Sequence, residues 1–304
     1  GYKINIAVIS GGNSEERLVS IRTGEAIAEA CNQLGYNTSK FVLNSNSIDL
    51  ILKDLKMHDF VFIALHGSFG EDGVIQSVLS KNNIAFNGSD EDSSRNCFNK
   101  SVTKEIVMKQ GVLSPKYFQT SSNTCNNHLD FNSEKYIVKP NSQGSSVGFN
   151  IVNKFENLND AIDIALDFDT SVLIEEFIDG REITVPILEN EPLPVIEIEP
   201  KSGIYDYKSK YTAGESKYIC PANLDKDKYQ FVQDCALSVH KMLDCSVYSR
   251  VDFKFYNNNF YFLEINTLPG MTETSLFPMA AERHGFSFKD VINKIIKLSL
   301  QKWA

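Results

Sequence analysis

Apolar residues in the first third of the chain recur in short runs separated by polar loops. The mostly apolar stretch at 4–9 is typical of a buried strand, and apolar positions spaced three and four apart over 18–34 predict a helix that Gly35 would end. A strand at 60–65 and a helix at 74–79 repeat this order. Alternation of this kind predicts a mainly parallel sheet, in which ligands gather beyond the carboxyl ends of the strands.

The pattern changes after residue 95. A helix over 96–110 should end near Gly111. Beyond it the sequence predicts further elements, namely strands at 135–140, 171–177, 181–188 and 193–199 and a helix at 155–168. Residues 200–220 lack an apolar period and carry several tyrosines among lysines and glycines, which indicates a long functional loop. We therefore expect a parallel-sheet α/β domain at 1–95, followed by mixed α+β structure.

The most informative segment is a hairpin predicted at 247–256 and 260–266, with three asparagines as its loop. Side chains alternate between the two faces of a strand. The polar face would then carry Arg250, Asp252, Phe262, Glu264 and Asn266. A three-residue loop places Asp252 opposite Glu264, and two facing carboxylates repel unless a cation lies between them. Oxygen ligands of this kind suit Mg²⁺. The alternative, more common for an isolated hairpin, is a solvated face with an ordinary salt bridge to Arg250.

A second candidate is the segment K-P-N-S-Q-G-S-S-V-G at 139–148. Backbone N–H groups and hydroxyls of a Gly/Ser loop can bind a phosphate chain, with Lys139 as a point charge. A flexible surface turn is the simpler interpretation of this loop alone. Lys100, which stands in the preceding helix, makes a phosphate-binding pair of lysines more plausible.

A third candidate is G-G-N-S-E-E-R-L-V-S at 11–20, which lacks the glycine spacing of a dinucleotide site. The simpler interpretation is a strand-to-helix turn, with Ser14 as the N-cap and Glu15 and Glu16 complementing the helix dipole. A carboxylate at the carboxyl end of a strand could instead bind the ammonium group of a substrate.

Composition excludes several functions for this chain of 304 residues. Its 30 Lys and Arg residues against 39 Asp and Glu residues give a net charge of -9, which argues against nucleic acid as a partner. No apolar run approaches the roughly 18 residues that a membrane span needs. The N-terminus enters the first strand without an apolar signal segment, so we expect a cytoplasmic protein. The six cysteines and five histidines lack the spacing of a zinc site.

Taken together, these motifs resemble those of the D-alanine:D-alanine ligases of the ATP-grasp superfamily. The agreement extends to about residue 285 and includes G-G-N-S-E-E-R-L-V-S, A-L-H-G-S-F-G-E-D-G, I-V-K-P, G-S-S-V-G, L-I-E-E-F, Y-D-Y-K-S-K-Y, S-R-V-D and L-E-I-N-T-L-P-G-M-T-E-T-S-L. The chain departs from the family pattern at Leu18, where an acidic residue is often present. It departs again at Cys97, Phe98 and Asn99, where Met-Asp commonly precedes the lysine.

The resemblance implies an ATP-grasp fold, with a central subdomain at 96–180 and a C-terminal catalytic subdomain at 181–304. It also implies which residues bind the nucleotide and the metal. The ATP-binding residues would be Lys100, Lys139 and Ser146 at or beside the phosphates, Glu175, Glu176, Phe177 and Ile178 at the adenine, Glu182 at the ribose, and in addition Lys210. Asp252, Glu264 and Asn266 would bind two Mg²⁺ ions, or Mn²⁺ in their place.

The resemblance assigns the amino-acid substrates to other residues. The first D-alanine would be bound through its ammonium group by Glu16, with His66 nearby, and the second through its carboxylate by Ser275 and Leu276. Three further implied roles complete the set: Arg250 and the backbone of Gly270 stabilise the tetrahedral oxyanion, and Ser145, Tyr211 and Glu16 form the contact that closes the 200–220 loop.

The implied activity is ATP-dependent ligation of two D-alanine molecules through a D-alanyl phosphate, for peptidoglycan precursor synthesis, by a homodimer that binds neither nucleic acid nor membrane. One alternative is another ATP-grasp carboxylate ligase, including a depsipeptide-forming relative that uses D-lactate. Those relatives typically carry a histidine on the loop where this chain has the neutral Tyr211, which favours D-alanine. A second alternative is a nucleotide-binding regulatory protein without turnover, against which Arg250 and the metal-binding set argue.

Overall fold

The first sheet is parallel, as the alternation of strands and helices predicts. The computed structural model describes residues 1–123, 129–144, 147–153, 158–200 and 216–304. The strand order is β2-β1-β3. The elements of this part are β1 (Asn5–Gly11), α1 (Arg17–Gln33), β2 (Asn37–Leu43), a 3-10 turn (Asp49–Ile51), α2 (Leu52–Leu55), β3 (Phe60–Ile63) and α3 (Val74–Lys81). The central strand β1 is almost wholly buried because helices and neighbouring strands cover it on every side.

Helix α1 ends where the sequence predicts. Gly35 has a φ of 88° and donates its N–H to the Asn32 carbonyl at 3.1 Å, while the Tyr36 N–H bonds to the Cys31 carbonyl at 3.1 Å. A glycine adopts this left-handed conformation without the steric penalty of a Cβ atom. The prediction of a helix that ends at Gly35 is therefore confirmed.

The single helix predicted at 96–110 is wrong, because the chain forms two helices there. Helix α4 covers Glu91–Phe98 and α5 covers Lys100–Lys109. Between them Asn99 is extended, with φ -95° and ψ 104°, and its side-chain oxygen accepts the Val102 N–H at 3.2 Å. An asparagine that caps the next helix interrupts the preceding one. The break makes Lys100 the first residue of α5.

A four-stranded antiparallel sheet in the order β4-β7-β5-β6 forms the central part of the chain. Its elements are β4 (Tyr117–Thr120), β5 (Lys135–Pro140), β6 (Asn150–Asn153), α6 (Leu158–Leu166) and β7 (Val172–Glu176). Apolar residues of α6 pack on one face of this sheet and form a separate hydrophobic core. The other face is left to line a cavity.

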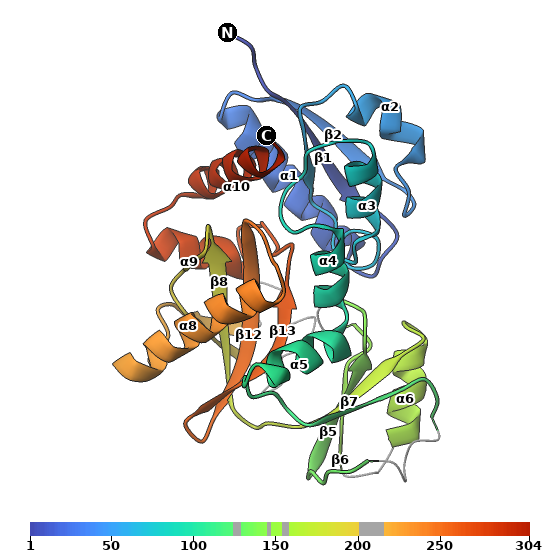
Figure 1. Ribbon diagram of the computed structural model, residues 1–304, viewed down its shortest axis with the longest axis vertical. Helices are drawn as coiled ribbons and strands as arrows, with labels where there is room; N and C mark the ends of the chain where they lie inside the picture. Colours follow the sequence, from blue (N-terminus) through green and yellow to red (C-terminus); the bar gives the residue numbers. More distant parts are fainter. Residues whose placement is uncertain (124–128, 145–146, 154–157, 201–215) are drawn as a thin grey trace.

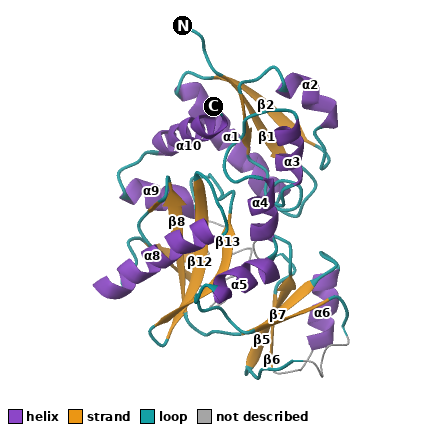
Figure 2. Ribbon diagram, viewed as in Figure 1, coloured by secondary structure: helices purple, strands orange, loops and turns teal. Residues whose placement is uncertain are grey.

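The last sheet has six strands and is also antiparallel. Its path is β11-β10-β8-β12-β13, with β9 paired to β8. The elements are β8 (Arg181–Leu188), β9 (Glu191–Pro192), β10 (Ile196–Pro200), β11 (Ser216–Ile219), α8 (Lys226–Met242), β12 (Tyr248–Tyr256) and β13 (Asn259–Asn266). Helices α5 and α8 contribute apolar side chains to the core on one face of this sheet (Figure 2). One parallel sheet followed by two antiparallel sheets confirms the predicted fold class.

The predicted hairpin exists, but its turn is shorter than predicted. Tyr256 pairs with Asn259, so the loop has two residues, and Asn257 and Asn258 both have positive φ, as a type I′ turn requires. A β-bulge between Asp252 and Phe253 then shifts the register by one residue. Asp252 therefore lies opposite Glu264 after all.

The bulge also corrects which residues face the core. Phe262, predicted on the polar face, pairs with Phe253 and is fully buried in the apolar core. Its neighbour Leu263 is half-buried and lines the cavity on the opposite side of the sheet. The predicted alternation does not include the extra residue of the bulge, so the faces predicted for the β13 residues between the turn and the bulge are inverted.

The C-terminal helices α9 (Leu276–Arg283) and α10 (Phe288–Trp303) pack on the first sheet. Figure 1 shows α10 beside α1, and the Trp303 and Phe86 rings lie 5.2 Å apart between their centroids. The last residues of the chain thus pack against the first sheet and α1, while the domain boundaries at 95/96 and 180/181 stay a prediction. Within the described ranges no helix combines the length and apolarity that a membrane crossing requires.

We predict that His240 makes the protein sensitive to acid. This residue of α8 is fully buried, and burial lowers its pKa from 6.5 to about 4. The unfolded chain binds the proton more readily, so the stability is present above pH 6.5 and is lost as the pH falls toward 4. When the pH is lowered from 7.5 to 5, the free energy of unfolding of the wild type should fall by about 2 kcal/mol more than that of His240→Asn, as measured by urea unfolding.

The exposed residue His284 provides the control, since His284→Asn should follow the wild-type pH dependence. Equal losses in the wild type and in His240→Asn would show that another group governs the acid sensitivity.

Candidate active site

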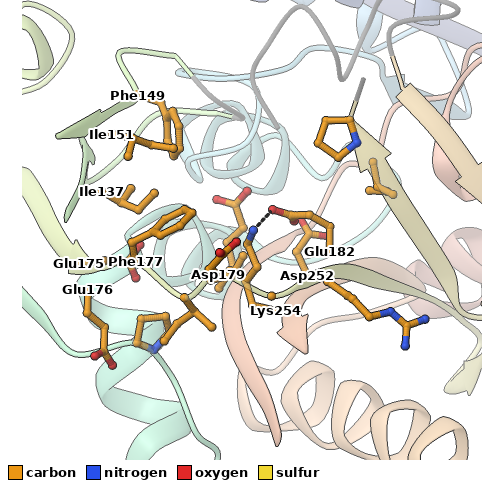
Figure 3. A pocket seen from close by; sticks show the side chains of 18 of the residues that line it. Ile137, Phe149, Ile151, Glu175, Glu176, Phe177, Asp179, Glu182, Asp252 and Lys254 are labelled. Carbon is orange, nitrogen blue, oxygen red and sulfur yellow. Dashed lines mark ion pairs between the residues drawn. The ribbon is translucent and has the colours of Figure 1, made fainter. Parts of the chain in front are cut away.

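A cavity of about 330 Å³ lies between the two antiparallel sheets. Figure 3 shows an apolar wall of Ile137, Phe149, Ile151 and Phe177 facing a polar wall that includes Glu182, Asp252 and Lys254. Ile137 and Ile151 lie on β5 and β6, Phe149 directly precedes β6, and Phe177 lies in the segment 175–178, the hinge that is predicted to bind the adenine. The polar residues come from β8 and β12. This arrangement suits a flat apolar group on one side and a charged group on the other.

Two lysines hold one buried carboxylate at this cavity. The Glu175 Oε1 atom lies 2.6 Å from the Lys139 Nζ atom, and its Oε2 atom lies 2.5 Å from the Lys104 Nζ atom. Burial alone would raise the pKa of Glu175, but the two ammonium groups outweigh it and lower this pKa to about 2. Burial lowers the pKa of Lys104 to about 8, against the attraction of Glu175. The cluster therefore carries one net positive charge at pH 7.

The predicted hinge residues follow Glu175 along the cavity wall. Glu176, Phe177 and Ile178 all line the cavity. The Glu176 carboxylate accepts the Lys116 backbone N–H at 2.9 Å, which holds the start of the hinge. Glu182 stands across the cavity and pairs with Lys254 at 2.7 Å (Figure 3). The residues predicted to bind the adenine and the ribose thus line the same cavity.

The two predicted metal-binding carboxylates lie opposite each other on β12 and β13. Asp252 accepts hydrogen bonds from Thr184 Oγ1 at 2.6 Å and from Arg250 Nε and Nη2, both at 3.1 Å. Thr184 reaches Asp252 because β8 pairs with β12 at this position. Glu264 lines the main cavity beside Asp252 and lies 3.7 Å from the Lys100 Nζ atom. Carboxylates and cations therefore alternate along the wall.

A smaller cavity of about 30 Å³ adjoins this wall. Glu264 lines both cavities, and the smaller one is also lined by Lys100, Asn266, Gly144 and Glu71. Burial lowers the pKa of Lys100, against the opposing effect of Glu264. The Lys100 ammonium donates to the Gln143 carbonyl at 2.6 Å, so the loop predicted to bind phosphate begins in contact with it. The described part of that loop is hydrogen-bonded to α5, which disfavours the interpretation as a flexible surface turn.

Glu16 and His66 lie together at the carboxyl ends of the parallel strands. Glu16 is buried, and a Cβ atom on Gly144 would come within 2.0 Å of its Oε2 atom, so the loop backbone rests directly on the carboxylate. Burial lowers the pKa of His66, but the Glu71 and Glu16 carboxylates outweigh it and the pKa is raised. Helix α1 has Glu16 as its N-cap residue without a side-chain capping bond, and the Ser14 hydroxyl donates to the His66 carbonyl at 2.9 Å and accepts the Glu16 N–H at 3.2 Å. The prediction of Ser14 as the N-cap is therefore wrong, whereas the strand-to-helix turn itself is present.

A third group of predicted residues lies between β13 and α9. A Cβ atom on Gly270 would lie 3.1 Å from the Ser275 Oγ atom, and this hydroxyl oxygen accepts the Thr272 N–H at 2.8 Å. Leu276 is buried in the hydrophobic cluster that includes the first sheet, so only its backbone is left for a substrate carboxylate. Ser145, Ser146, Lys210 and Tyr211 lie outside the described residues.

Sequence reasoning missed three polar residues of the cavity region, namely Lys104, Thr184 and Lys254. Lys254 had a signal, because it stands two positions after Asp252 and so shares its face. Lys104 stands one helical turn after Lys100, which also could have been noticed. No local pattern distinguishes Thr184, whose partner is 68 residues away.

A parallel sheet followed by two antiparallel sheets around a shared cavity is the ATP-grasp architecture. The family model described as D-ala D-ala ligase C-terminus matches residues 105–297. The D-alanine–D-alanine ligase of Methylacidiphilum infernorum is 43% identical over 300 residues, which cover 98% of this chain and 96% of that one. The corresponding ligase of Aquifex aeolicus is 40% identical over 96% of this chain and 100% of its own. The chain therefore belongs to the D-alanine–D-alanine ligase family.

Two solved structures are similar over nearly the whole chain. The D-alanine–D-alanine ligase of Bacillus anthracis complexed with ATP has a TM-score of 0.84 at 31% identity and covers 99% of this chain and 98% of its own. The VanG D-Ala:D-Ser ligase of Enterococcus faecalis has a TM-score of 0.83 at 28% identity, covering 98% of this chain and 100% of its own. The fold is thus shared by ligases that differ in their second amino acid.

Proposed function

We infer that this protein joins two D-alanine molecules to D-alanyl-D-alanine at the expense of ATP, as an ADP-forming ligase of peptidoglycan precursor synthesis. The observation that carries this inference is one cavity lined by Lys139, the Glu175 hinge and the Asp252–Glu264 pair. Full-length similarity to D-alanine–D-alanine ligases supports the choice of substrate.

The side chains support a reaction without a protein nucleophile. The carboxylate of the first D-alanine attacks the γ-phosphorus of ATP, ADP leaves, and a D-alanyl phosphate results. The amine of the second D-alanine then attacks the acyl carbon and phosphate leaves. Lys100 and Lys139, which pair with Glu264 and Glu175, are proposed to offset the negative charge that spreads over the transferring phosphoryl group. Arg250 and the Gly270 N–H are proposed to stabilise the tetrahedral oxyanion.

The metal-binding proposal fits the chemistry of the donors. Asp252, Glu264 and Asn266 offer only oxygen atoms, which a hard cation prefers. Within the described residues no group of three or more His, Cys, Asp and Glu side chains could hold a metal. Two carboxylates and one amide leave coordination positions for water and phosphate oxygens, as Mg²⁺ commonly has. When bound there, two Mg²⁺ ions, or Mn²⁺, would neutralise the phosphate oxygens.

The amino-acid side of the proposal rests on the buried Glu16. We propose that it binds the ammonium group of the first D-alanine, with His66 beside it, and that Ser275 and the Leu276 backbone bind the carboxylate of the second. Glu71, which pairs with His66 at 3.4 Å, lines the same small cavity as Asn266. This shared lining supports a reaction centre between the nucleotide and amino-acid residues. Exclusion of water from such a centre protects an acyl phosphate.

We further propose that the protein works as a cytoplasmic homodimer, as the resemblance implies. The remaining assigned residues are Ser146 at the phosphates, Lys210 as a further ATP-binding residue, and Ser145 and Tyr211 at the closing contact.

A phosphate-release assay tests the function directly. The protein, ATP and Mg²⁺ should release phosphate with D-alanine, and much less with L-alanine or D-lactate. Phosphate release that is best with D-lactate would favour a depsipeptide ligase. A protein that binds ATP but releases no phosphate with any of the three would support the regulatory alternative.

We predict that Glu264→Gln nearly abolishes turnover. The neutral amide cannot balance a dication, and the loss of metal-assisted charge stabilisation should lower kcat about 10³-fold. Steady-state kinetics at ordinary Mg²⁺ concentration measure the effect. The exposed Glu282→Gln serves as the control and should keep wild-type kcat. Near-normal activity of Glu264→Gln would remove Glu264 from the metal site.

A second prediction concerns Arg250. Arg250→Ala should lower kcat about 10²- to 10³-fold, the usual scale for one oxyanion donor. The exposed Arg95→Ala is the matched control. If KM for ATP rises while kcat stays constant, Arg250 acts in binding through its contact with Asp252, and the oxyanion role is wrong.

A third prediction concerns the second substrate and rests on Tyr211. A neutral tyrosine does not repel an incoming ammonium, whereas a protonated histidine would. With D-alanine and D-lactate supplied together, the products separated at pH 6 and at pH 8 should be mainly D-alanyl-D-alanine. Predominant D-alanyl-D-lactate at both pH values would refute this role of Tyr211.

A further inference from the structure

Lys104 is a buried lysine that none of the proposed catalytic steps uses. Its side chain is 0% exposed, and it does not line the cavity, although its ion-pair partner Glu175 does. Its ammonium donates to Glu175 Oε2 at 2.5 Å and to Ser114 Oγ at 2.6 Å. Burying a charged group costs free energy, which only an oppositely charged partner can offset. The position of Lys104 behind the cavity wall therefore needs an explanation.

The ion pairs of Glu175 explain why Lys104 is buried at this place. Each of its oxygens has its own ammonium partner, Lys139 on the cavity side and Lys104 on the far side. If Lys139 were the only partner, its departure toward a phosphate would leave a buried carboxylate unpaired. Breaking a buried pair in this way is strongly destabilising, because it leaves an uncompensated charge away from water. With Lys104 in place, Glu175 keeps a cation when Lys139 moves.

We propose that Lys104 is a positioning residue for nucleotide binding, which neutralises Glu175 from behind the cavity wall and so releases the Lys139 ammonium to the phosphates of the nucleotide. The proposal rests on the proposed use of ATP. It extends the phosphate-binding set to a residue that never touches the ligand.

The surroundings of Lys104 fix its head group in this role. Ser114, which accepts from Lys104, donates in turn to the Phe262 carbonyl at 2.7 Å. The ring of Tyr117 lies 5.2 Å from the ammonium and adds a cation–π contact. A lysine held by a hydroxyl, a ring and a carboxylate cannot follow the nucleotide into the cavity. Lys139 has no such second anchor among the contacts of the described residues.

Binding of ADP and of adenosine to Lys104→Met, measured by calorimetry with Mg²⁺, tests the proposal. Methionine has nearly the length of lysine but no charge, so Glu175 would hold Lys139. The Kd for ADP should rise about tenfold or more, and the Kd for adenosine should change less than about threefold, because only ADP needs the ammonium. Lys109→Met, on the exposed side of the same helix, should bind both ligands as the wild type does.

The double variant Lys104→Met with Glu175→Gln separates this role from simple stability. Removal of the carboxylate frees Lys139 again, so the double variant should bind ADP at least threefold more tightly than Lys104→Met. Lys104→Gln, which keeps a donor for Ser114, should repeat the single-variant pattern if Lys104→Met does not fold. Equal weakening of ADP and adenosine, or no recovery in the double variant, would overturn the proposal.

Ligase turnover of the wild type, measured alongside, separates the two levels of inference. ADP binding does not depend on which amino acid is ligated. A wild type that binds ADP but forms no dipeptide would refute the proposed function while the comparison of the Lys104 variants still decided the positioning role.

Discussion

The β-bulge between Asp252 and Phe253 is the constraint on which the site depends. The two-residue turn alone would put Asp252 opposite Leu263 and place Glu264 on the core face, because side chains alternate with a period of two. One extra residue restores the pairing of the two carboxylates and keeps Phe253 and Phe262 in the core. The bulge thus lets β13 direct Phe262 to the core and Glu264 to the cavity.

Alternation of charge is the second organising feature. Glu175 lies between two lysines, Glu264 lies near Lys100, and Asp252 is held by Arg250 and Thr184. In a buried setting each charge needs an opposite partner, since the cost of removing it from water is otherwise large. A triphosphate with its cations can enter such a cavity by exchanging partners, so that few charges are left unpaired at any stage.

The break between α4 and α5 and the bonded start of the 141–148 loop connect the two sides of the site. Asn99 ends one helix and caps the next, and its Oδ1 atom also accepts from the Asn141 Nδ2 atom at 2.7 Å. Lys100 thereby stands beside Gln143, while Gly144 rests on Glu16. The residues proposed to bind the nucleotide and the buried carboxylate of Glu16 are consequently joined through one short segment.

The amino-acid sequence by itself determined the alternation of strands and helices in the first part of the chain, the hairpin, and the identity of Lys100, Lys139, Asp252 and Glu264 as site candidates, because these features appear as local periodicity and as motifs. Tertiary structure decided the rest. Apolar alternation does not reveal a bulge, so the predicted loop length and the face of Phe262 were wrong although the opposition of the carboxylates was right. Thr184 and Lys104 reach their partners only when strands and helices distant in sequence pack together. Local patterns report which face a side chain takes, whereas the choice between hydrogen-bond and ion-pair partners depends on which elements the packed core brings side by side.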